Sequence, residues 1–269
     1  MLHQIHNTTG DVYNAFIYRH TDYSAHFHKA FEFIMPIKGE MRATVNQSDY
    51  RLQTGECLLV PSYAMHSLSV KDGNDCMVVV FAEQYAESAA KRFRDNEPDG
   101  YRMRLSDAVQ GYLMAGLAGE RSEAEWDGAI ELKKPPLYRL KACLYMIFDE
   151  FVSQNSMHRK NADGELVARL IEHVEREYAT DLTLTALAQR MGYSYDYLSR
   201  VFNHTFHVNF KTIVNQYRCE RAIYLLQTTQ KSLTEIASDS GFQSIRSFNR
   251  VFKEITGVMP SQIRRNERE

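Results

Sequence analysis

Apolar and polar residues alternate with a period of two from about Val12 to Ala82. Turn sequences such as Lys38-Gly39-Glu40 and Asp72-Gly73-Asn74 recur in this stretch, roughly every eight to twelve residues. Many short strands at such spacing are typical of a small antiparallel barrel or jelly roll. We therefore expect strands at residues 12–18, 31–37, 41–45, 57–60, 66–70 and 76–81.

The period lengthens to that of an amphipathic helix at residues 103–117 and again at 137–154. An apolar stripe on the second helix either covers the barrel or packs against the same helix of a second subunit. This stripe consists of Leu140, Leu144, Ile147, Phe148 and Phe151. Charged and small residues from Gly119 to Lys134 predict an exposed, mobile loop around Trp126, and the polar stretch 157–165 predicts a linker.

One pattern occurs twice in the C-terminal part of the chain. Leu184-Thr185, Gly192-Tyr193 and Arg200-Val201-Phe202 reappear 49 or 50 residues later as Leu233-Thr234, Gly241-Phe242 and Arg250-Val251-Phe252. Each copy contains a short amphipathic helix, a glycine suited to end it, a serine cap and a second helix. This order predicts two helix-turn-helix units, at 184–205 and 233–255, joined by a long helix at about 209–227.

The second helix of each copy has an apolar face and a polar face with no evident structural role. Arg and Asn can form two hydrogen bonds with a guanine or adenine edge in the major groove, and Lys binds phosphates. The alternative, an ordinary solvent-exposed face, is less favoured because the polar face occurs twice. Asp196 is disfavoured as a base contact, since phosphates repel a carboxylate. The candidate DNA-binding residues are Ser199, Arg200, Asn203, Arg246, Asn249, Arg250 and Lys253.

Bulk charge does not by itself indicate a nucleic-acid partner. The formal net charge is −2, with 14 Lys and Arg against 12 Asp and Glu from Glu165 onward, so DNA binding depends on where the arginines lie. Four widely spaced cysteines form no Cys-x-x-Cys pair, which argues against a structural zinc or disulfide framework and agrees with a reducing cytoplasm. We find no signal peptide and no run of eighteen apolar residues, and therefore expect a cytoplasmic protein without a membrane partner.

Four potential metal ligands lie within the predicted barrel: His26, His28, Glu32 and His66. Two histidines at positions i and i+2 share one face of a strand, and imidazole with carboxylate suits Zn, Fe, Mn or Ni. The alternative is that these side chains, with Tyr50, hydrogen-bond a small polar effector such as a sugar or a related metabolite. We favour the polar effector, so no cofactor is expected, and a divalent metal is the other interpretation.

The C-terminal repeat resembles the DNA-binding domain of the AraC/XylS family of bacterial transcription regulators. The match comprises Ile236-Ala237, Gly241-Phe242, Ser244, Phe248, Arg250, Phe252-Lys253, Gly257, Pro260 and Ile263-Arg264, with Arg218, Ala222 and Leu225-Leu226 in the joining helix. His207 departs from the glycine that usually ends the first unit. The resemblance implies binding to double-stranded DNA, a homodimer and RNA polymerase as a partner, with activation the favoured outcome.

The N-terminal part resembles the cupin barrel in its two sequence motifs. The matching positions are His26, His28, Glu32 and Gly39, followed by Gly55, Pro61 and His66. Tyr63 and Val70 depart from the glycine and asparagine expected in the second motif. In metal-binding cupins the two histidines, the acid and the later histidine converge on a divalent metal. In sensor cupins attached to this kind of DNA-binding domain, the matching side chains line an effector pocket.

The sequence thus predicts an α+β protein of two domains. A cupin-like jelly-roll barrel occupies 1–100, a helical dimerisation or cover segment 101–156, a linker 157–165 and an AraC-type DNA-binding domain 166–266. The expected function is that of a non-enzymatic transcription regulator that binds DNA under the control of a small polar effector. The alternative is a metal-dependent cupin enzyme, a dioxygenase or an isomerase, which leaves the C-terminal repeat unexplained.

Overall fold

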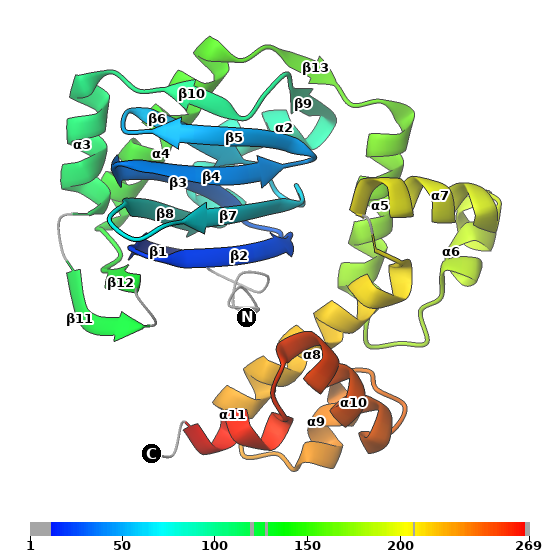
Figure 1. The fold of residues 1–269 in the computed structure, drawn as a ribbon. Helices are drawn as coiled ribbons and strands as arrows, with labels where there is room; N and C mark the ends of the chain where they lie inside the picture. Colours follow the sequence, from blue (N-terminus) through cyan, green and yellow to red (C-terminus); the bar gives the residue numbers. More distant parts are fainter. Residues whose placement is uncertain (1–11, 119–120, 127–128, 207, 267–269) are drawn as a thin grey trace. The chain divides into compact units, whose positions relative to one another are not determined.

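The computed structural model describes residues 12–118, 121–126, 129–206 and 208–266 (Figure 1). Contacts between these residues separate two compact units, and the division falls between Lys160 and Asn161. The N-terminal unit is built of antiparallel strands with a few helices, and the described part of the C-terminal unit contains only helices. The predicted α+β fold class with a cupin-like N-terminal domain and a helical C-terminal domain is confirmed.

The strands of the N-terminal unit form a seven-stranded and a four-stranded antiparallel sheet (Figure 1). The larger sheet has the order β10 (Arg102–Arg104), β6 (Glu56–Val60), β3 (Phe31–Lys38), β8 (Asp75–Phe81), β1 (Tyr13–Tyr18), β12 (Ala129–Leu132) and β11 (Arg121–Trp126). The smaller sheet has the order β2 (Thr21–His26), β7 (His66–Val70), β4 (Glu40–Val45) and β5 (Ser48–Gln53). All six predicted strands are present, whereas β2 and β5 were not predicted.

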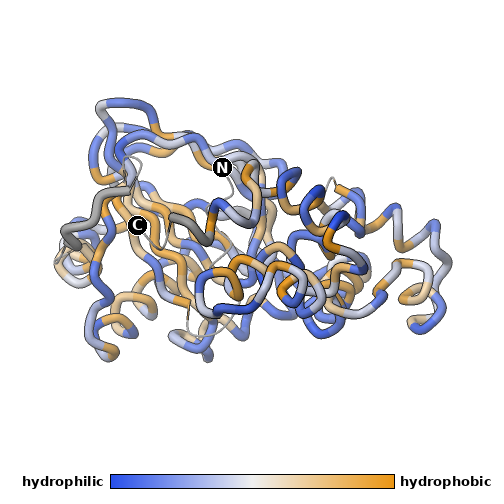
Figure 2. The backbone as a smooth tube through the Cα atoms, turned by 90° about the horizontal axis from the view of Figure 1, so that it is seen from below, coloured by the Kyte–Doolittle hydropathy of each residue, from blue (hydrophilic) through white to orange (hydrophobic). Residues whose placement is uncertain are grey.

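A core of alternating residues fills the space between the two sheets. In β3, Phe33 contributes to the outer face of the larger sheet, while Ile34 joins the core between the sheets. Leu68 of β7 and Val45 of β4 belong to the same core and come from the smaller sheet. Figure 2 accordingly shows long hydrophobic stretches where the strands of this core lie. Glu32 precedes Phe33 and therefore faces the same way as Ile34, into the double sheet.

Helices cover the outer face of the larger sheet. The principal one is α4 (Leu137–Gln154), and its predicted apolar stripe is entirely buried against the strands. Phe148 packs on Phe31 of β3, with ring centroids 5.4 Å apart. The stripe therefore serves to cover the sheet, the first of the two expected roles. The smaller helices of the unit are η2 (Glu83–Ala86), α1 (Glu87–Ala90), α2 (Arg92–Asp95) and α3 (Asp107–Leu117).

Three expectations for the segment after residue 100 were wrong or incomplete. Residues 121–126 and 129–132 form a pair of strands, where we predicted a loop, and β12 pairs with β1. The open edge of β1 accounts for β12, whose Ala129 and Leu132 also join the hydrophobic cores of the unit. Met103, which we expected in a helix, lies in β10 and pairs with Cys57 of β6. The predicted linker contains β13 (Met157–Arg159), which pairs with β9 (Asn96–Pro98), and the first turn of the following helix.

The C-terminal unit consists of seven helices in its described part. They are α5 (Ala162–Glu177), α6 (Leu184–Met191), α7 (Tyr195–Phe206), α8 (Phe210–Thr228), α9 (Leu233–Asp239), α10 (Ile245–Thr256) and α11 (Pro260–Asn266). The pairs α6–α7 and α9–α10 are the two predicted helix-turn-helix units, and α8 is the predicted joining helix. Leu225 and Leu226 of α8 share a core with Phe248 and Phe252 of α10. No helix of the described residues is long and apolar enough to cross a bilayer.

A left-handed glycine ends the first helix of each unit. Gly192 has φ 75° and Gly241 has φ 85°. A Cβ atom on Gly192 would meet no other atom within 4 Å, whereas a Cβ on Gly241 would lie 2.5 Å from Cα of Ala179. The second turn therefore packs closely against the segment that follows α5. His207, the departure from the expected glycine in the first unit, lies outside the described residues.

Candidate DNA-binding surface and buried histidine cluster

The second helices of the two units repeat the same burial pattern residue by residue. From Asp196 to His204 the order of exposed, half-buried and buried side chains matches that from Arg246 to Glu254. Arg200 and Arg250 occupy equivalent, exposed positions. A common scaffold therefore turns the same face of α7 and α10 to solvent, as expected for two helices that enter successive segments of a major groove.

The exposed cationic side chains of α7 and α10 differ in their ion pairing. Arg250 pairs with Glu254 one turn later, with Nη1 and Oε2 3.2 Å apart. No ion pair within the described residues involves Arg246, so its guanidinium is available to a ligand. Lys253 is exposed as well. Arg246, Arg250 and Lys253 give α10 a cationic face, whereas the matching face of α7 carries the single cation Arg200 beside the exposed Asp196.

Three of the predicted DNA-binding residues have local partners or are partly covered. Asn203 is exposed, and its Nδ2 donates to Oγ of Ser199 at 3.3 Å. Ser199 and Asn249 are half-buried at equivalent positions. Oδ1 of Asn249 is buried and has no hydrogen-bond partner among the described residues. Ser199 and Asn249 therefore lie at the margin of the surface, while Asn203, the arginines and Lys253 form its exposed part.

Our sequence reasoning missed two exposed apolar side chains on this surface. Tyr195 and Ile245 are the first residues of α7 and α10, and they are 51% and 38% exposed. They follow the equivalent residues Ser194 and Ser244, whose hydroxyls accept hydrogen bonds from backbone amides of the first turn. The start of a recognition helix is the part that contacts base edges, and apolar groups can contact the thymine methyl. An apolar residue directly after the cap in both copies was the available signal.

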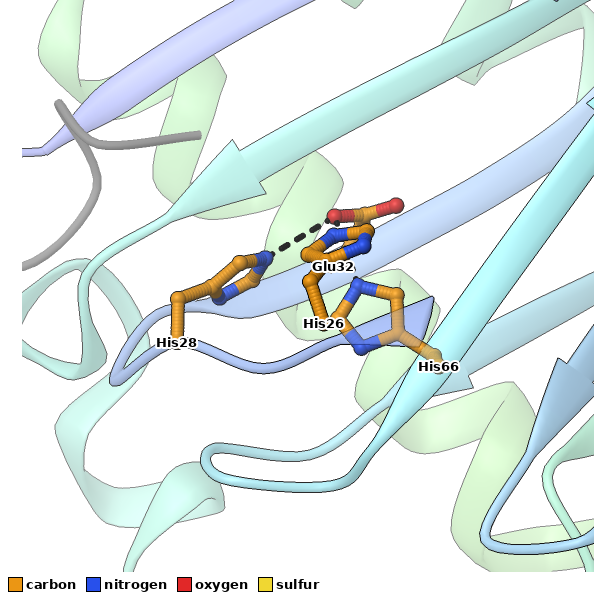
Figure 3. Close-up of side chains that lie close together, drawn as sticks. All are labelled: His26, His28, Glu32 and His66. Atoms are coloured by element: carbon orange, nitrogen blue, oxygen red, sulfur yellow. Dashed lines mark hydrogen bonds and ion pairs between the residues drawn. The ribbon is translucent and has the colours of Figure 1, made fainter. Parts of the chain in front are cut away.

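The second site is the histidine cluster between the sheets, formed by His26, His28, Glu32 and His66 (Figure 3). His26 ends β2, His66 begins β7, Glu32 lies in β3, and His28 lies in the connection between β2 and β3. The structure brings all four together, as the sequence predicted. All four are buried, and one potential ligand atom from each lies within 4.8 Å of the other three.

Backbone carbonyls orient the three imidazole rings. Nδ1 of His26 lies 2.9 Å from the carbonyl oxygen of Ser24, and Nδ1 of His66 lies 2.8 Å from that of Ala64. Nδ1 of His28 makes the equivalent contact with a carbonyl at 3.0 Å. Because a carbonyl only accepts, each Nδ1 carries the hydrogen, and each Nε2 of a neutral ring presents a lone pair. Histidines that bind a metal through one ring nitrogen commonly donate the other N–H to a carbonyl in this way.

Two of the Nε2 atoms face the Glu32 carboxylate, and a proton or a cation is needed between each of them and the oxygen, which only accepts. Nε2 of His28 lies 3.0 Å and Nε2 of His66 lies 3.3 Å from Oε2 of Glu32. Nε2 of His26 and Oε1 of Glu32 are buried without a hydrogen-bond partner among the described residues. Buried polar atoms without partners are uncommon and call for a proton, a water molecule or an ion. The donor set therefore fits a divalent cation.

The pKa values of the cluster follow from burial and from Glu32. Burial lowers the pKa of His26 to about 3 and also lowers the pKa of His28. Burial acts on His66 in the same sense, but the Glu32 carboxylate more than offsets it and raises the pKa of His66. Burial alone would raise the pKa of Glu32, yet His66 and His28 hold it below its usual range. The Glu32 carboxylate thus favours the protonated form of His66, whereas burial disfavours the protonated forms of His26 and His28.

Tyr63 connects the cupin motif to the backbone of this site. The motif expects glycine at this position, and Tyr63 adopts φ 66°, in the left-handed region that glycine favours. Its amide donates to the carbonyl of His28 at 2.8 Å, which ties the His28 connection to the turn before His66. The backbone conformation of the motif is thus retained despite the substitution, at the cost of local strain.

Tyr50, the remaining predicted effector residue, has other neighbours. Its hydroxyl accepts a hydrogen bond from the amide of Tyr101 at 3.3 Å. It also lines an open groove of about 430 Å³ on the four-stranded sheet, together with Arg42, Asp49 and Ser67. The four cluster residues do not belong to the lining of that groove.

Two such helix-turn-helix units beside a cupin-like domain are the architecture of one class of two-domain transcription regulators. Residues 13–173 match the family model of the AraC-like ligand binding domain, and residues 187–266 match that of a helix-turn-helix domain. The chain therefore belongs to the AraC/XylS family of transcription regulators, as its sequence suggested.

Relatives agree with this assignment over parts of the chain. An uncharacterized HTH-type transcriptional regulator of Staphylococcus aureus (strain MSSA476) is 35% identical over 102 residues, which cover 38% of this chain and 14% of that protein. The Msm operon regulatory protein of Streptococcus mutans is 26% identical over 129 residues, 48% of this chain and 45% of that protein. The chain thus matches less than half the length of these two curated relatives. The crystal structure of ToxT from Vibrio cholerae shares the fold, with a TM-score of 0.59 and 15% identity over 93% of this chain and 97% of ToxT.

Proposed function

We propose that this regulator binds its target DNA through α7 and α10 and that the histidine cluster of the N-terminal unit controls this binding. The repeated burial pattern of the two helices supports DNA binding, since α7 turns Arg200 to solvent and α10 turns Arg250 to solvent at the equivalent position. Arg246, which makes no ion pair among the described residues, is the proposed principal base reader, with Arg250 and Lys253 beside it. In this proposal a small ligand binds at the histidine cluster and thereby changes the affinity for DNA.

The ligand we propose for the cluster includes a divalent cation. The single observation that carries this proposal is the convergence of four donor atoms within 4.8 Å of one another. This space suits an ion better than a sugar ring. His26, His28, Glu32 and His66 would hold the cation, which would supply positive charge and a Lewis-acid position for a hydroxyl or carboxylate of an effector.

A polar organic effector without a metal is the second candidate. Nε2 of His26 and Oε1 of Glu32, which are buried without a partner among the described residues, favour this candidate because one hydroxyl could satisfy both atoms. A sugar would supply such groups. Unsaturated fatty acid is the ligand named for one ToxT structure. In this chain the Glu32 anion would repel a second carboxylate unless a cation lay between them.

The experiment is a metal analysis of the purified full chain and of Glu32→Gln, which keeps the shape of the side chain. We expect the wild type to hold Zn, Fe, Mn or Ni in a 1:1 ratio and Glu32→Gln to lose it. DNA affinity should then change on metal removal in the wild type and stay constant in the variant. A wild type that takes up none of these ions, yet gains thermal stability with a sugar, would replace the cation with the second candidate.

We also propose a homodimer and activation of transcription by contact with RNA polymerase in the cytoplasm. The exposed aromatic residues Tyr112 of α3 and Tyr138 of α4 support the dimer, because Tyr138 is 87% exposed. The test is the sedimentation behaviour of the wild type against a Tyr112→Ser, Tyr138→Ser double variant. A wild type that sediments as a monomer at micromolar concentration would remove the dimer from the proposal.

Transcription in vitro with purified polymerase distinguishes activation from repression.

A further inference from the structure

Four side chains of the C-terminal unit form a continuous stack from α5 to α7. Arg169 of α5 lies over the ring of Tyr193, with Cζ 6.0 Å from the ring centroid, and its Nη2 donates to the tyrosine hydroxyl at 3.2 Å. The rings of Tyr193 and Tyr197 lie 5.5 Å apart at an angle of 33°. Arg200 closes the stack, with Cζ 5.5 Å from the centroid of the Tyr197 ring. Each cation therefore faces an aromatic ring, the geometry of a cation–π contact.

The Tyr197 ring is also fixed at its far end. Its hydroxyl donates to Oδ1 of Asp163 at 2.6 Å. Asp163 belongs to the first turn of α5, which is capped by Asn161, and this turn begins where the C-terminal unit begins. The short distance is that of a hydrogen bond to a charged acceptor. Tyr197 is thus held by a carboxylate at its hydroxyl, by Tyr193 through its ring, and by the helix at its backbone.

The second helix-turn-helix unit has no such stack. Position 247, equivalent to 197, is Ser247, and Phe242, equivalent to Tyr193, is buried beneath Arg218, whose Cζ lies 5.9 Å from its ring centroid. Arg250, equivalent to Arg200, is held by Glu254 on its own helix. The two units therefore constrain equivalent arginines by different means, an aromatic ring in the first and a carboxylate in the second.

We infer that Tyr197 is a positioning residue that holds the Arg200 guanidinium in the orientation needed to read a base. This inference rests on the proposed role of Arg200 in DNA binding. A guanidinium stacked on a ring keeps its N–H groups in its own plane, where they can donate to the O6 and N7 acceptors of guanine. Stacking also restricts a long, flexible side chain before DNA arrives, which reduces the entropy lost on binding. A carboxylate partner, as in Arg250, would instead compete with DNA for the same donors.

Asp163 and Arg169 support the Tyr197 ring from α5. The ring would otherwise rotate about its side-chain torsions on the surface of α7, because Tyr197 is only half-buried. Asp163 fixes the hydroxyl end, and Arg169 fixes Tyr193, against which the ring stacks. The orientation of Arg200 thus depends on α5, a helix outside the helix-turn-helix unit itself.

The experiment uses the full chain and a duplex selected by the wild-type protein from random-sequence DNA, with a scrambled duplex of the same composition. The variants are Tyr197→Leu, Tyr197→Phe, Arg200→Ala and the double variant Tyr197→Leu, Arg200→Ala. We expect Tyr197→Leu to weaken binding to the selected duplex about two- to fivefold and to leave the scrambled duplex unaffected. Its preference at the base read by Arg200 should relax. Tyr197→Phe keeps the ring but loses the hydrogen bond to Asp163, so it should lose less base preference than Tyr197→Leu.

The double variant separates positioning from a general structural effect. If Tyr197 acts through Arg200, the double variant binds no more weakly than Arg200→Ala alone. Additive losses, or equal losses on both duplexes, would overturn the inference and make Tyr197 a structural or phosphate-contacting residue. If Arg200→Ala weakened binding and Tyr197→Leu did not, the positioning role of Tyr197 would be wrong and the proposed role of Arg200 would stand. No loss with Arg200→Ala would overturn both this inference and the proposed role of Arg200.

Discussion

The two equivalent glycines offer an internal comparison of conformational strain with steric packing. Alanine at Gly192 would have to adopt φ 75° but would meet no atom within 4 Å. The left-handed conformation costs a non-glycine residue roughly 1–2 kcal/mol, so Gly192→Ala should destabilise the C-terminal unit by about that amount. Alanine at Gly241 carries the same conformational cost at φ 85°. Its Cβ would also lie 2.5 Å from Cα and 2.8 Å from the carbonyl carbon of Ala179.

The contact with Ala179 is with backbone, which cannot move aside as a side chain can. Overpacking of this kind typically costs about 1–3 kcal/mol, so Gly241→Ala should lose roughly 2–5 kcal/mol in total. The assay is urea unfolding of the full chain, followed by the helical signal in far-ultraviolet circular dichroism. Gly192→Ala is the matched control, because it has the same change and nearly the same φ. Equal losses for the two variants would refute the close packing of the second turn against the segment after α5.

Three further predictions concern stability, pH and base recognition. Leu225→Ala should leave a cavity in the core shared with α10 and cost about 2–5 kcal/mol in the same urea titration, with a lowered melting temperature. The pKa values of His26 and His28 are lowered in the folded chain, so on acidification below about pH 6.5 the unfolded chain binds protons that the folded chain does not. Stability of the metal-free protein should therefore fall with decreasing pH, by up to about 1.4 kcal/mol per pH unit for each histidine, and a His26→Asn variant should show a shallower slope. Replacing thymine by uracil in the selected duplex should weaken the wild type at one position but leave Ile245→Ala unaffected there; an equal response of both proteins would exclude a methyl contact by Ile245.

Alternation and helical periodicity were sufficient to predict much of the fold. The six strands expected between residues 12 and 81 are all present, and α4 has the predicted bounds of 137–154. The strands β11 and β12 could not be predicted in this way, because β12 pairs with the distant edge of β1 and β11 pairs with β12. Pairing with a distant edge leaves little trace in local sequence.

The sites were predicted to a similar degree. The residue types and spacing of His26, His28, Glu32 and His66 were enough to expect a common site, and the repeat was enough to identify the exposed arginines of α7 and α10. The direction of each imidazole depends on backbone carbonyls such as those of Ser24 and Ala64, which have no sequence signature. The placement of the Tyr197 ring likewise depends on contacts from α5, between residues 24 and 34 positions apart in the chain.

The most direct test of DNA recognition by the two helices is the affinity of Arg246→Ala for the selected duplex and for scrambled DNA. Arg246 is exposed on the first turn of α10, and no ion pair among the described residues constrains it. Removing an arginine that reads a base should cost about 1–3 kcal/mol, or roughly ten- to hundredfold in affinity, on the selected duplex alone. Arg250→Ala, which removes an arginine already paired with Glu254, is the comparison and should weaken both duplexes more evenly. Equal weakening of both duplexes by Arg246→Ala, or no weakening of either, would contradict its assignment as a base reader.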